Sequence, residues 1–505
     1  LGYGLYLAKG SGMILQSTGG ILGIVLGQGR ILTNLTYFVF HTYFPLNVYP
    51  IAIFAIIVHT INALLVFFLA RKIFKNNLSA FLGSMFFAVN SVSQSAITWT
   101  AASINTLPST TLILIALTFY FKYLESFRQK WLGLSFILIY VSLFFKETGV
   151  FLLLLLPLFT LVYKKQNILE FIKRYWYYFV TVFLIVVFRL WGFMSESSQV
   201  ALFLTGSSKY FFDSLVLRSI LYPLTSFSLS IIPPDIFLVF SRYITNVYYP
   251  FIPETQFILI AQTVVLDLLS IIFSSIIVII SVILYKNSDI KIRKQMVFWF
   301  VFLLASFLPY IIISKSFSYL ESRYYYLASV AWGMIFAWSM TLLLEKIKNL
   351  YIKIIFITIF LMFIILHIKI ITTDINKLVV ESQTRINILN QISTIKPKLE
   401  DKKNIFYVSG DNDYYLVGNK VPFQQGVGYT LLSFYFHKSK YPREFLNNTD
   451  LFEIGKQGYY EKDGYVFGYF TDQKLMEEQA KKYKIPVNNI YKFYYNSKTA
   501  LIEKL

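Results

Sequence analysis

Long apolar runs separated by short polar stretches dominate the first 371 positions of this 505-residue chain. A run of about 17–25 apolar residues is long enough to cross a bilayer as a helix. Ten runs reach or approach that length: 49–70, 78–91, 106–121, 131–145, 148–163, 176–192, 259–285, 297–313, 326–344 and 354–371. We therefore predict an all-α polytopic membrane protein, in which residues 49–371 form a bundle of about ten transmembrane helices.

Residues 193–258 interrupt this series of runs and are predicted to form a long outer loop. Within them, the apolar piece from Phe211 to Ile232 contains Pro223 and is followed by Pro233-Pro234. Proline breaks or kinks a helix because it lacks a backbone N–H. We expect a re-entrant helix, a surface helix or one half of a pair of crossings here.

From Thr372 onward the composition becomes charged and rich in turn residues, as in Ser409-Gly410-Asp411-Asn412-Asp413. Apolar residues recur at helical spacing over 373–395, and 405–408 and 465–470 have the pattern of strands. These features predict a small soluble α/β domain over residues 372–505.

Charge indicates which side of the membrane each segment occupies. Only 14% of residues are charged, although the net charge is +20, and this apolar composition excludes an ordinary soluble enzyme. Most basic residues before Thr372 lie in five short loops rather than on one face, which argues against a nucleic-acid partner. Under the positive-inside rule these loops are cytoplasmic, so the C-terminal domain is predicted to be extracytoplasmic.

The abundance of Lys, Ile, Asn, Phe and Tyr is typical of an AT-rich, prokaryotic genome, and we expect a plasma-membrane location.

The N-terminal region contains no carboxylate, because the first acidic residue of the chain is Glu125. The chain begins at Leu1 rather than Met and contains no cysteine, which excludes disulfides and thiolate chemistry. We interpret residues 1–48 as an outer loop region that follows a first span missing from this chain.

Charged residues at the predicted outer ends of the spans are the candidate site residues, since an ion near lipid is costly and is usually retained for a function. They are Arg30, Lys146, Glu147, Arg189 and Arg323. Several cations at one membrane edge would bind an anion, and arginine binds phosphate in bidentate fashion. A phosphate-bearing lipid fits this pattern.

Simpler interpretations remain open for individual residues. A single arginine at a span end, such as Arg189, commonly extends to lipid headgroups, and Lys146-Glu147 can form a surface ion pair. Tyr324 to Tyr326 are typical of an interfacial aromatic belt. His59 and Asn62 are expected to form a hydrogen bond between helices.

Five short motifs occur in an order that is similar to that of one enzyme family. They are Gly29-Arg30-Ile31-Leu32, His59 to Asn62, Ala96-Ile97-Thr98-Trp99, Phe145-Lys146-Glu147-Thr148 and Arg323-Tyr324-Tyr325-Tyr326-Leu327-Ala328-Ser329. Through them, roughly residues 28–371 resemble the multi-spanning glycosyltransferases of the GT-C superfamily, specifically its protein O-mannosyltransferase-like group.

The resemblance implies a GT-C-like fold and an integral membrane hexosyltransferase. Such an enzyme moves a sugar from a polyprenyl-phosphate carrier to an acceptor glycan, lipid or protein on the extracytoplasmic side. It further implies that donor phosphate is bound by Lys146, Arg189, Arg323 and Arg30. Residues that line the substrate site are expected to be Gln94, Trp99, Asn105 and Tyr324.

Departures from the family pattern limit these expectations. The family's catalytic acid follows its first span, so the general base is expected upstream of Leu1; Glu147 is a possible catalytic residue, although we favour a role in orienting the adjacent Lys146. Ser95 and Asn105 stand where relatives often carry Glu and Asp. Because hard cations need oxygen anions, a divalent metal is possible but disfavoured, and we name no metal ligand and no cofactor.

Two other classes of function explain the apolar runs. A transporter or lipid flippase would carry mid-membrane charges or a repeat between its halves, and neither feature is visible in the sequence. A catalytically inactive GT-C-derived scaffold, acting through its outer domain, is the other alternative.

Overall fold

The computed structural model describes residues 30–44, 47, 49–164, 169, 172–173, 176, 179–180, 182–184, 187, 208–248, 256–311, 322–346, 349–396, 398–399, 402–410, 431, 435, 440–442, 445, 459–470, 472–496, 499 and 501–504. The chain divides into two compact units. The larger contains Ile14–Thr36 and Val48–Thr372, and the smaller contains Leu1–Met13, Tyr37–Asn47 and Thr373–Leu505.

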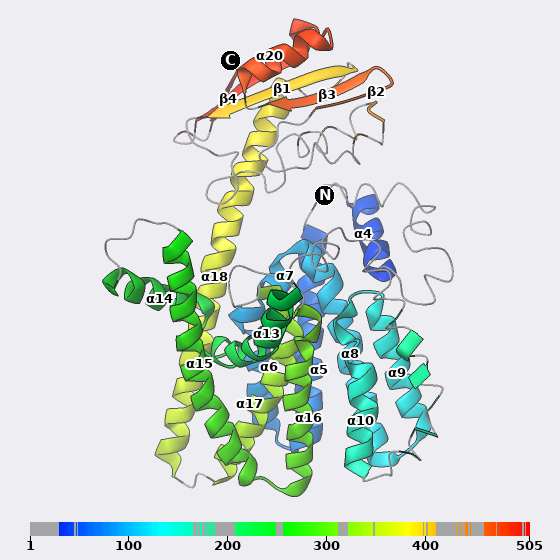
Figure 1. Ribbon diagram of the computed structural model, residues 1–505, viewed down its shortest axis with the longest axis vertical. Helices are drawn as coiled ribbons and strands as arrows, with labels where there is room; N and C mark the ends of the chain where they lie inside the picture. The colour runs from blue at the N-terminus through cyan, green and yellow to red at the C-terminus, as the bar shows by residue number, and fades with distance from the viewer. Residues whose placement is uncertain are drawn as a thin grey trace. The chain divides into compact units, whose positions relative to one another are not determined.

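Helices make up the larger unit (Figure 1). Their bounds are α5 Tyr49–Phe74, α6 Asn77–Ala88, α7 Ser95–Thr98, α8 Thr100–Ser126, α9 Gln129–Leu143, α10 Leu152–Lys164, α13 Ser208–Leu229, α14 Pro234–Tyr248, α15 Gln256–Lys286, α16 Ile290–Ser306, α17 Tyr326–Lys346 and α18 Leu350–Ile395. A further helix, α4, covers Ile31–Tyr43. α6 packs against α5 and α17, and α8 packs against α5 and α9.

The prediction of ten spans is wrong for the part of the chain that the structure describes. Six helices there are long and apolar enough to cross a membrane, or up to eight if each of two bent helix pairs counts as one span. The runs 131–145 and 148–163 correspond to helices of 15 and 13 residues. At 1.5 Å per residue these are about 20–22 Å long, shorter than a hydrocarbon core of about 30 Å. The run 176–192 lies largely outside the described residues.

The predicted broken element near Pro233 is confirmed. α13 ends at Leu229, α14 begins at Pro234, and the two helices are bent by 102°. Proline suits the first position of a helix because the N–H it lacks would have no partner there. Pro223, in contrast, lies inside α13.

A second break separates α6 from α7, where the chain bends by 44°. The two breaks are joined by hydrogen bonds. Asn90 Nδ2 donates to the Ser230 carbonyl at 2.9 Å, and His367 Nε2 donates to the Ile231 carbonyl at 3.3 Å. His367 Nδ1 accepts from the backbone N–H of Ser91 at 3.0 Å. Backbone groups left unpaired by the breaks therefore find partners inside the protein, as the membrane interior requires.

The hydrogen bond expected from His59 and Asn62 is confirmed as a network on α5. His59 Nε2 lies 3.0 Å from the Ala88 carbonyl and must donate to it, so Nδ1 accepts from the Tyr326 hydroxyl at 2.8 Å. Asn62 Nδ2 donates to the same hydroxyl at 3.1 Å, and Asn62 Oδ1 accepts from Thr111 at 2.7 Å. These bonds tie α5 to α8 and α17.

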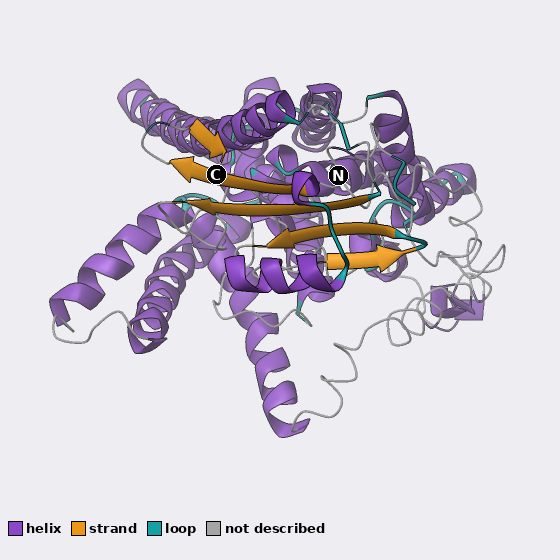
Figure 2. Ribbon diagram, turned by 90° about the horizontal axis from the view of Figure 1, so that it is seen from above, coloured by secondary structure: helices purple, strands orange, loops and turns teal. Residues whose placement is uncertain are grey.

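The smaller unit contains the predicted sheet. Among the described residues, five strands are ordered β2-β3-β1-β4-β5. Their bounds are β1 Lys403–Gly410, β2 Tyr459–Lys462, β3 Tyr465–Phe470, β4 Ile490–Asn496 and β5 Leu501–Lys504. The central β1 is parallel to β3 and β4, and the two edge strands are antiparallel to their neighbours (Figure 2). The predicted strands 405–408 and 465–470 fall within β1 and β3.

Helices cover both faces of this sheet. α20, Gln473–Lys482, packs on β1 and β3 through Met476 and Ala480. On the other face, Ile388 and Ile392 belong to the cluster around Phe406. The helix predicted over 373–395 is therefore the C-terminal part of the continuous α18.

Candidate anion-binding site

The turn between α9 and α10 places Lys146 against the N-terminal part of α8. Ser109 Oγ donates to the Lys146 carbonyl at 3.4 Å. Gly149, in the same turn, also lies close to α8, because a Cβ added there would be 2.9 Å from Ile113 Cδ1. A side chain at position 149 would require the Ile113 side chain to shift, so glycine suits the close approach of this turn to α8.

Lys146 is almost completely buried, with 5% of its surface exposed. Its Nζ donates to Thr106 Oγ1 at 2.8 Å and lies 5.9 and 5.7 Å from the ring centroids of Tyr310 and Tyr324. This turn lies outside the six described helices that are long and apolar enough to cross a membrane. Burial lowers the pKa of Lys146 to about 7, against attraction by the Glu147 carboxylate and with repulsion from the Arg30 and Arg323 cations. The Lys146 amine is therefore poised to gain a proton and become an ammonium when an anion approaches.

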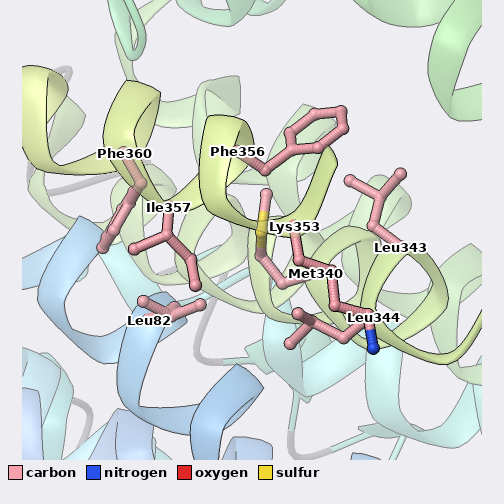
Figure 3. Close-up of a pocket in the computed structure, with 8 residues that line it drawn as sticks. All are labelled: Leu82, Met340, Leu343, Leu344, Lys353, Phe356, Ile357 and Phe360. Atoms are coloured by element: carbon pink, nitrogen blue, oxygen red, sulfur yellow. The ribbon is translucent and has the colours of Figure 1, made fainter. Parts of the chain in front are cut away.

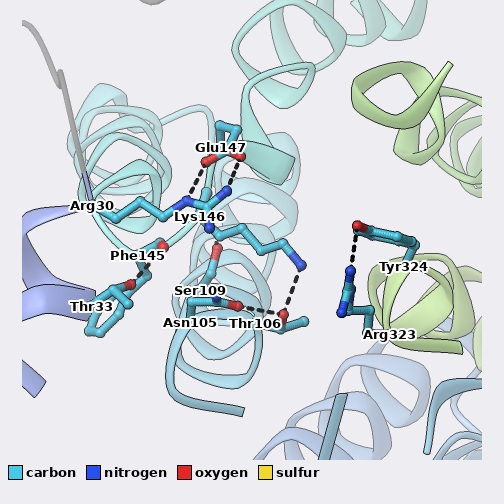
Figure 4. Close-up of polar contacts among 10 residues, drawn as sticks. All are labelled: Arg30, Thr33, Asn105, Thr106, Ser109, Phe145, Lys146, Glu147, Arg323 and Tyr324. Atoms are coloured by element: carbon cyan, nitrogen blue, oxygen red, sulfur yellow. Dashed lines mark hydrogen bonds and ion pairs between the residues drawn. The ribbon is translucent and has the colours of Figure 1, made fainter. Parts of the chain in front are cut away.

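Glu147 forms a bidentate ion pair with Arg30 (Figure 4). Arg30 Nε donates to Glu147 Oε2 at 3.0 Å, and Nη2 donates to Oε1; both side chains are 41% exposed. Thr33 Oγ1 also donates to the Phe145 carbonyl at 2.8 Å. We expected Glu147 to orient the adjacent Lys146, but the structure pairs Glu147 with Arg30 and Lys146 with Thr106.

Arg323 lies on a single helical turn, Ser322–Tyr325, that precedes α17. Its guanidinium carbon is 3.9 Å from the ring centroid of Trp99 and 4.7 Å from that of Tyr324. Arg323 Nη2 donates to the Tyr324 hydroxyl at 2.9 Å. Arg323 and Lys146 therefore both lie near the same tyrosine ring, and Figure 4 shows the Lys146 chain extending toward Arg323 and Tyr324.

Three predicted site residues remain, and of those that the structure describes, only Asn105 is joined to Lys146 by hydrogen bonds. Asn105 Oδ1 accepts from Thr106 Oγ1 at 2.8 Å, so Lys146, Thr106 and Asn105 form a hydrogen-bonded series. Gln94 is buried, and its carbonyl accepts from the Thr98 backbone N–H at 3.1 Å. Arg189 lies outside the described residues.

Two residues of the site were not predicted from the sequence. Thr106 is 40 positions away from Lys146, and Tyr310 is much farther along the chain. Thr106 directly follows Asn105, a predicted site residue. This position beside Asn105 was the only feature of the sequence that pointed to Thr106. The ring centroid of Tyr310 lies 4.5 Å from that of Tyr324. No local sequence pattern predicts this contact.

Two other features bear on ligands. Among the described residues, no three His, Asp or Glu side chains gather in a way that could hold a metal ion.

An apolar depression between α6, α17 and α18, lined by Lys353 among others (Figure 3), has a volume of only about 10 Å³. This space fits no more than one water molecule and cannot hold a substrate.

Chemically, the cluster around Tyr324 is suited to an anion. It offers two cations and a hydroxyl group on the ends of apolar helices, next to the Arg30–Glu147 pair. Phosphate takes such charge-assisted hydrogen bonds readily. Comparison with family models, curated proteins and solved structures found no match to this chain.

Proposed function

We propose that this chain is an integral membrane glycosyltransferase that moves a sugar from a polyprenyl-phosphate carrier to an acceptor hydroxyl. One observation carries the proposal. The buried Lys146 and the stacked Arg323 flank Tyr324 at the ends of apolar helices. These residues belong to motifs through which the sequence resembles the GT-C group.

Burial of a lysine supports an anionic ligand. Moving an ammonium out of water costs several kcal/mol unless a partner compensates. Thr106 supplies one neutral acceptor, which compensates only in part. Among the described residues, the cations Lys146, Arg323 and Arg30 outnumber the one carboxylate, that of Glu147. An incoming phosphate would therefore meet more positive than negative charge on these side chains.

The proposed reaction is a displacement at the anomeric carbon of the donor sugar. The bond between this carbon and the phosphate oxygen breaks, and the acceptor oxygen forms a new bond to the carbon. The acceptor proton passes to a general base, and the carrier leaves as polyprenyl phosphate. Lys146 and Arg323 would stabilise the negative charge that grows on the leaving phosphate.

Glu147 has a positioning role in this proposal. Arg30 donates to both of its oxygens, and such bonds stabilise the ionised carboxylate and make it a weaker base. Through Arg30 and Thr33, the start of α4 is held on the turn that contains Lys146. Following the resemblance, we assign the general base to a carboxylate outside the described residues.

The test is sugar transfer by the full-length protein in liposomes, with radiolabelled polyprenyl-phosphate hexoses as donors. We expect Lys146→Ala and Arg323→Ala each to lower the rate about 10²- to 10³-fold. Lys130→Ala is the matched control, because Lys130 is an exposed cation that lies 5.0 Å from the Trp131 ring. Wild-type rates in both site variants would overturn the proposal. Movement of the donor across the bilayer without product would favour a transporter or flippase instead.

A further inference from the structure

A second basic site lies where α5 turns into α6. An open recess of about 560 Å³ is lined there by Phe68, Arg71, Lys72, Lys75 and Asn77. Lys72 is paired with Glu125 of α8 at 3.1 Å. The charge of Lys72 is therefore balanced by Glu125, whereas Arg71 and Lys75 give the recess two further positive charges.

This recess is distant from the site around Lys146. Glu125 and Thr106 both lie on α8 and are 19 positions apart, which corresponds to about 28 Å along a helix. That distance is close to the thickness of a hydrocarbon core, about 30 Å. The two basic sites therefore lie at opposite ends of the same membrane-spanning helix.

The backbone strengthens the positive potential of the recess. Lys75 has a left-handed backbone with φ of 57°, and this turn starts α6 directly afterwards, at Asn77. The N-terminus of a helix carries partial positive charge, which favours an anion. Asn77 itself lines the recess.

An apolar stripe on α5 leads into the recess. Its exposed residues recur every three or four positions along one helix face, which is the spacing of neighbours on a helix. They are Ile53, Ile57, Ile61, Leu64 and Phe68, each 41–57% exposed. Arg71 continues the same spacing on α5, and Lys75 follows directly after the helix ends at Phe74.

We propose that the recess binds one anionic phospholipid, with its phosphate between Arg71 and Lys75 and an acyl chain along the α5 stripe. A ligand with a single negative headgroup and a long apolar tail matches this arrangement. Inorganic phosphate shares the headgroup chemistry but has no tail. A zwitterionic lipid has the tail but no net charge.

Native mass spectrometry of the full-length protein tests this proposal, because it counts bound lipids directly. The probes are phosphatidylglycerol and phosphatidylcholine with identical acyl chains. We expect preferential retention of phosphatidylglycerol, which Arg71→Gln and Lys75→Asn each reduce about fivefold. Asparagine is chosen at position 75 because it tolerates a left-handed backbone.

Lys286→Gln is the matched control, since Lys286 is an exposed cation in the last turn of α15 and should leave the preference unchanged. Equal retention of both lipids by the wild-type protein would overturn the proposal. So would a double variant that folds, with an unchanged melting temperature, and keeps its preference. If 10 mM inorganic phosphate displaces phosphatidylglycerol completely, the recess is a free-phosphate site. None of these readouts depends on sugar transfer.

Discussion

Lys146 Nζ donates a hydrogen bond to Thr106 Oγ1 at 2.8 Å and so joins the turn after α9 to the start of α8. The residue that carries the charge and the residue that receives the bond are 40 positions apart in sequence. An ammonium held by one neutral hydroxyl in a buried site is sensitive to pH and to any anion that reaches it.

The first prediction concerns stability and pH. Burial lowers the pKa of Lys146 from 10.5 to about 7, so between pH 7 and 10.5 the unfolded chain binds more protons than the folded one. Stability should therefore rise with pH across this window, by at most about 5 kcal/mol. Melting temperatures measured from pH 6 to pH 10 give the slope.

Lys146→Met is the control for this slope, because methionine fills much of the same volume without a titratable group. The variant should lose the part of the rise that Lys146 contributes. If wild type and variant have the same pH dependence between pH 7 and 10, Lys146 is not the titrating group.

The second prediction concerns Trp99, which is a positioning residue for Arg323. Its ring centroid lies 3.9 Å from the guanidinium carbon, and such a contact contributes about 0.5–2 kcal/mol. Trp99→Ala should raise the KM for the lipid-linked donor about tenfold, with a smaller change in kcat. Trp99→Phe should restore most of the loss, because phenylalanine keeps an aromatic face.

Trp131 provides a matched comparison for this variant. Lys122 Nζ lies 3.8 Å from the Trp131 ring, a similar contact near the other end of α8. Trp131→Ala should leave the KM unchanged. Equal effects of the Trp99 and Trp131 variants would mean that the contact at Trp99 is structural only.

The third prediction concerns the contact between α6 and α17. A Cβ added at Gly83 would lie 2.5 Å from the Gly333 carbonyl oxygen and 2.6 Å from Ala337 Cβ. Gly83→Ala must therefore push the two helices apart and should destabilise the protein by about 1–3 kcal/mol. Thermal unfolding in detergent measures the change.

Gly133 offers the opposite case on α9, because a Cβ there would meet no atom within 4 Å. Gly133→Ala should be neutral or stabilise the protein by up to about 1 kcal/mol, through helix propensity. A similar loss in both variants would contradict the packing argument.

The sequence predicted long helices well and short ones poorly. α5, α8, α15, α17 and α18 each contain one predicted run, because a continuous apolar segment of that length is stable only as a helix in lipid. The run 78–91 looked equivalent but ends in a bend after α6. Hydropathy records where a segment is apolar, and it does not record where hydrogen bonds from Asn90 and His367 stabilise a break.

The partners of the charged residues were also harder to predict than their positions. Lys146 and Arg323 were identified as candidate site residues, and the structure brings both to Tyr324. Glu147 was expected to orient its neighbour Lys146, yet its partner is Arg30, 117 positions away. Adjacent side chains in a tight turn can point in different directions, so nearness in sequence was a poor guide to pairing.

The last prediction tests the buried network on α5. The Tyr326 hydroxyl donates to His59 Nδ1 and accepts from Asn62 Nδ2. Tyr326→Phe removes this hydroxyl and leaves the two partners without that bond, which should cost about 1–3 kcal/mol. Tyr351→Phe is the matched control, because Tyr351 is 77% exposed and its hydroxyl can bond to solvent in both states. The melting temperature should fall for Tyr326→Phe and stay unchanged for Tyr351→Phe. An unchanged value for both would mean that His59 and Asn62 find other partners when the hydroxyl is removed, and the network would then contribute little to the packing of α5 against α17.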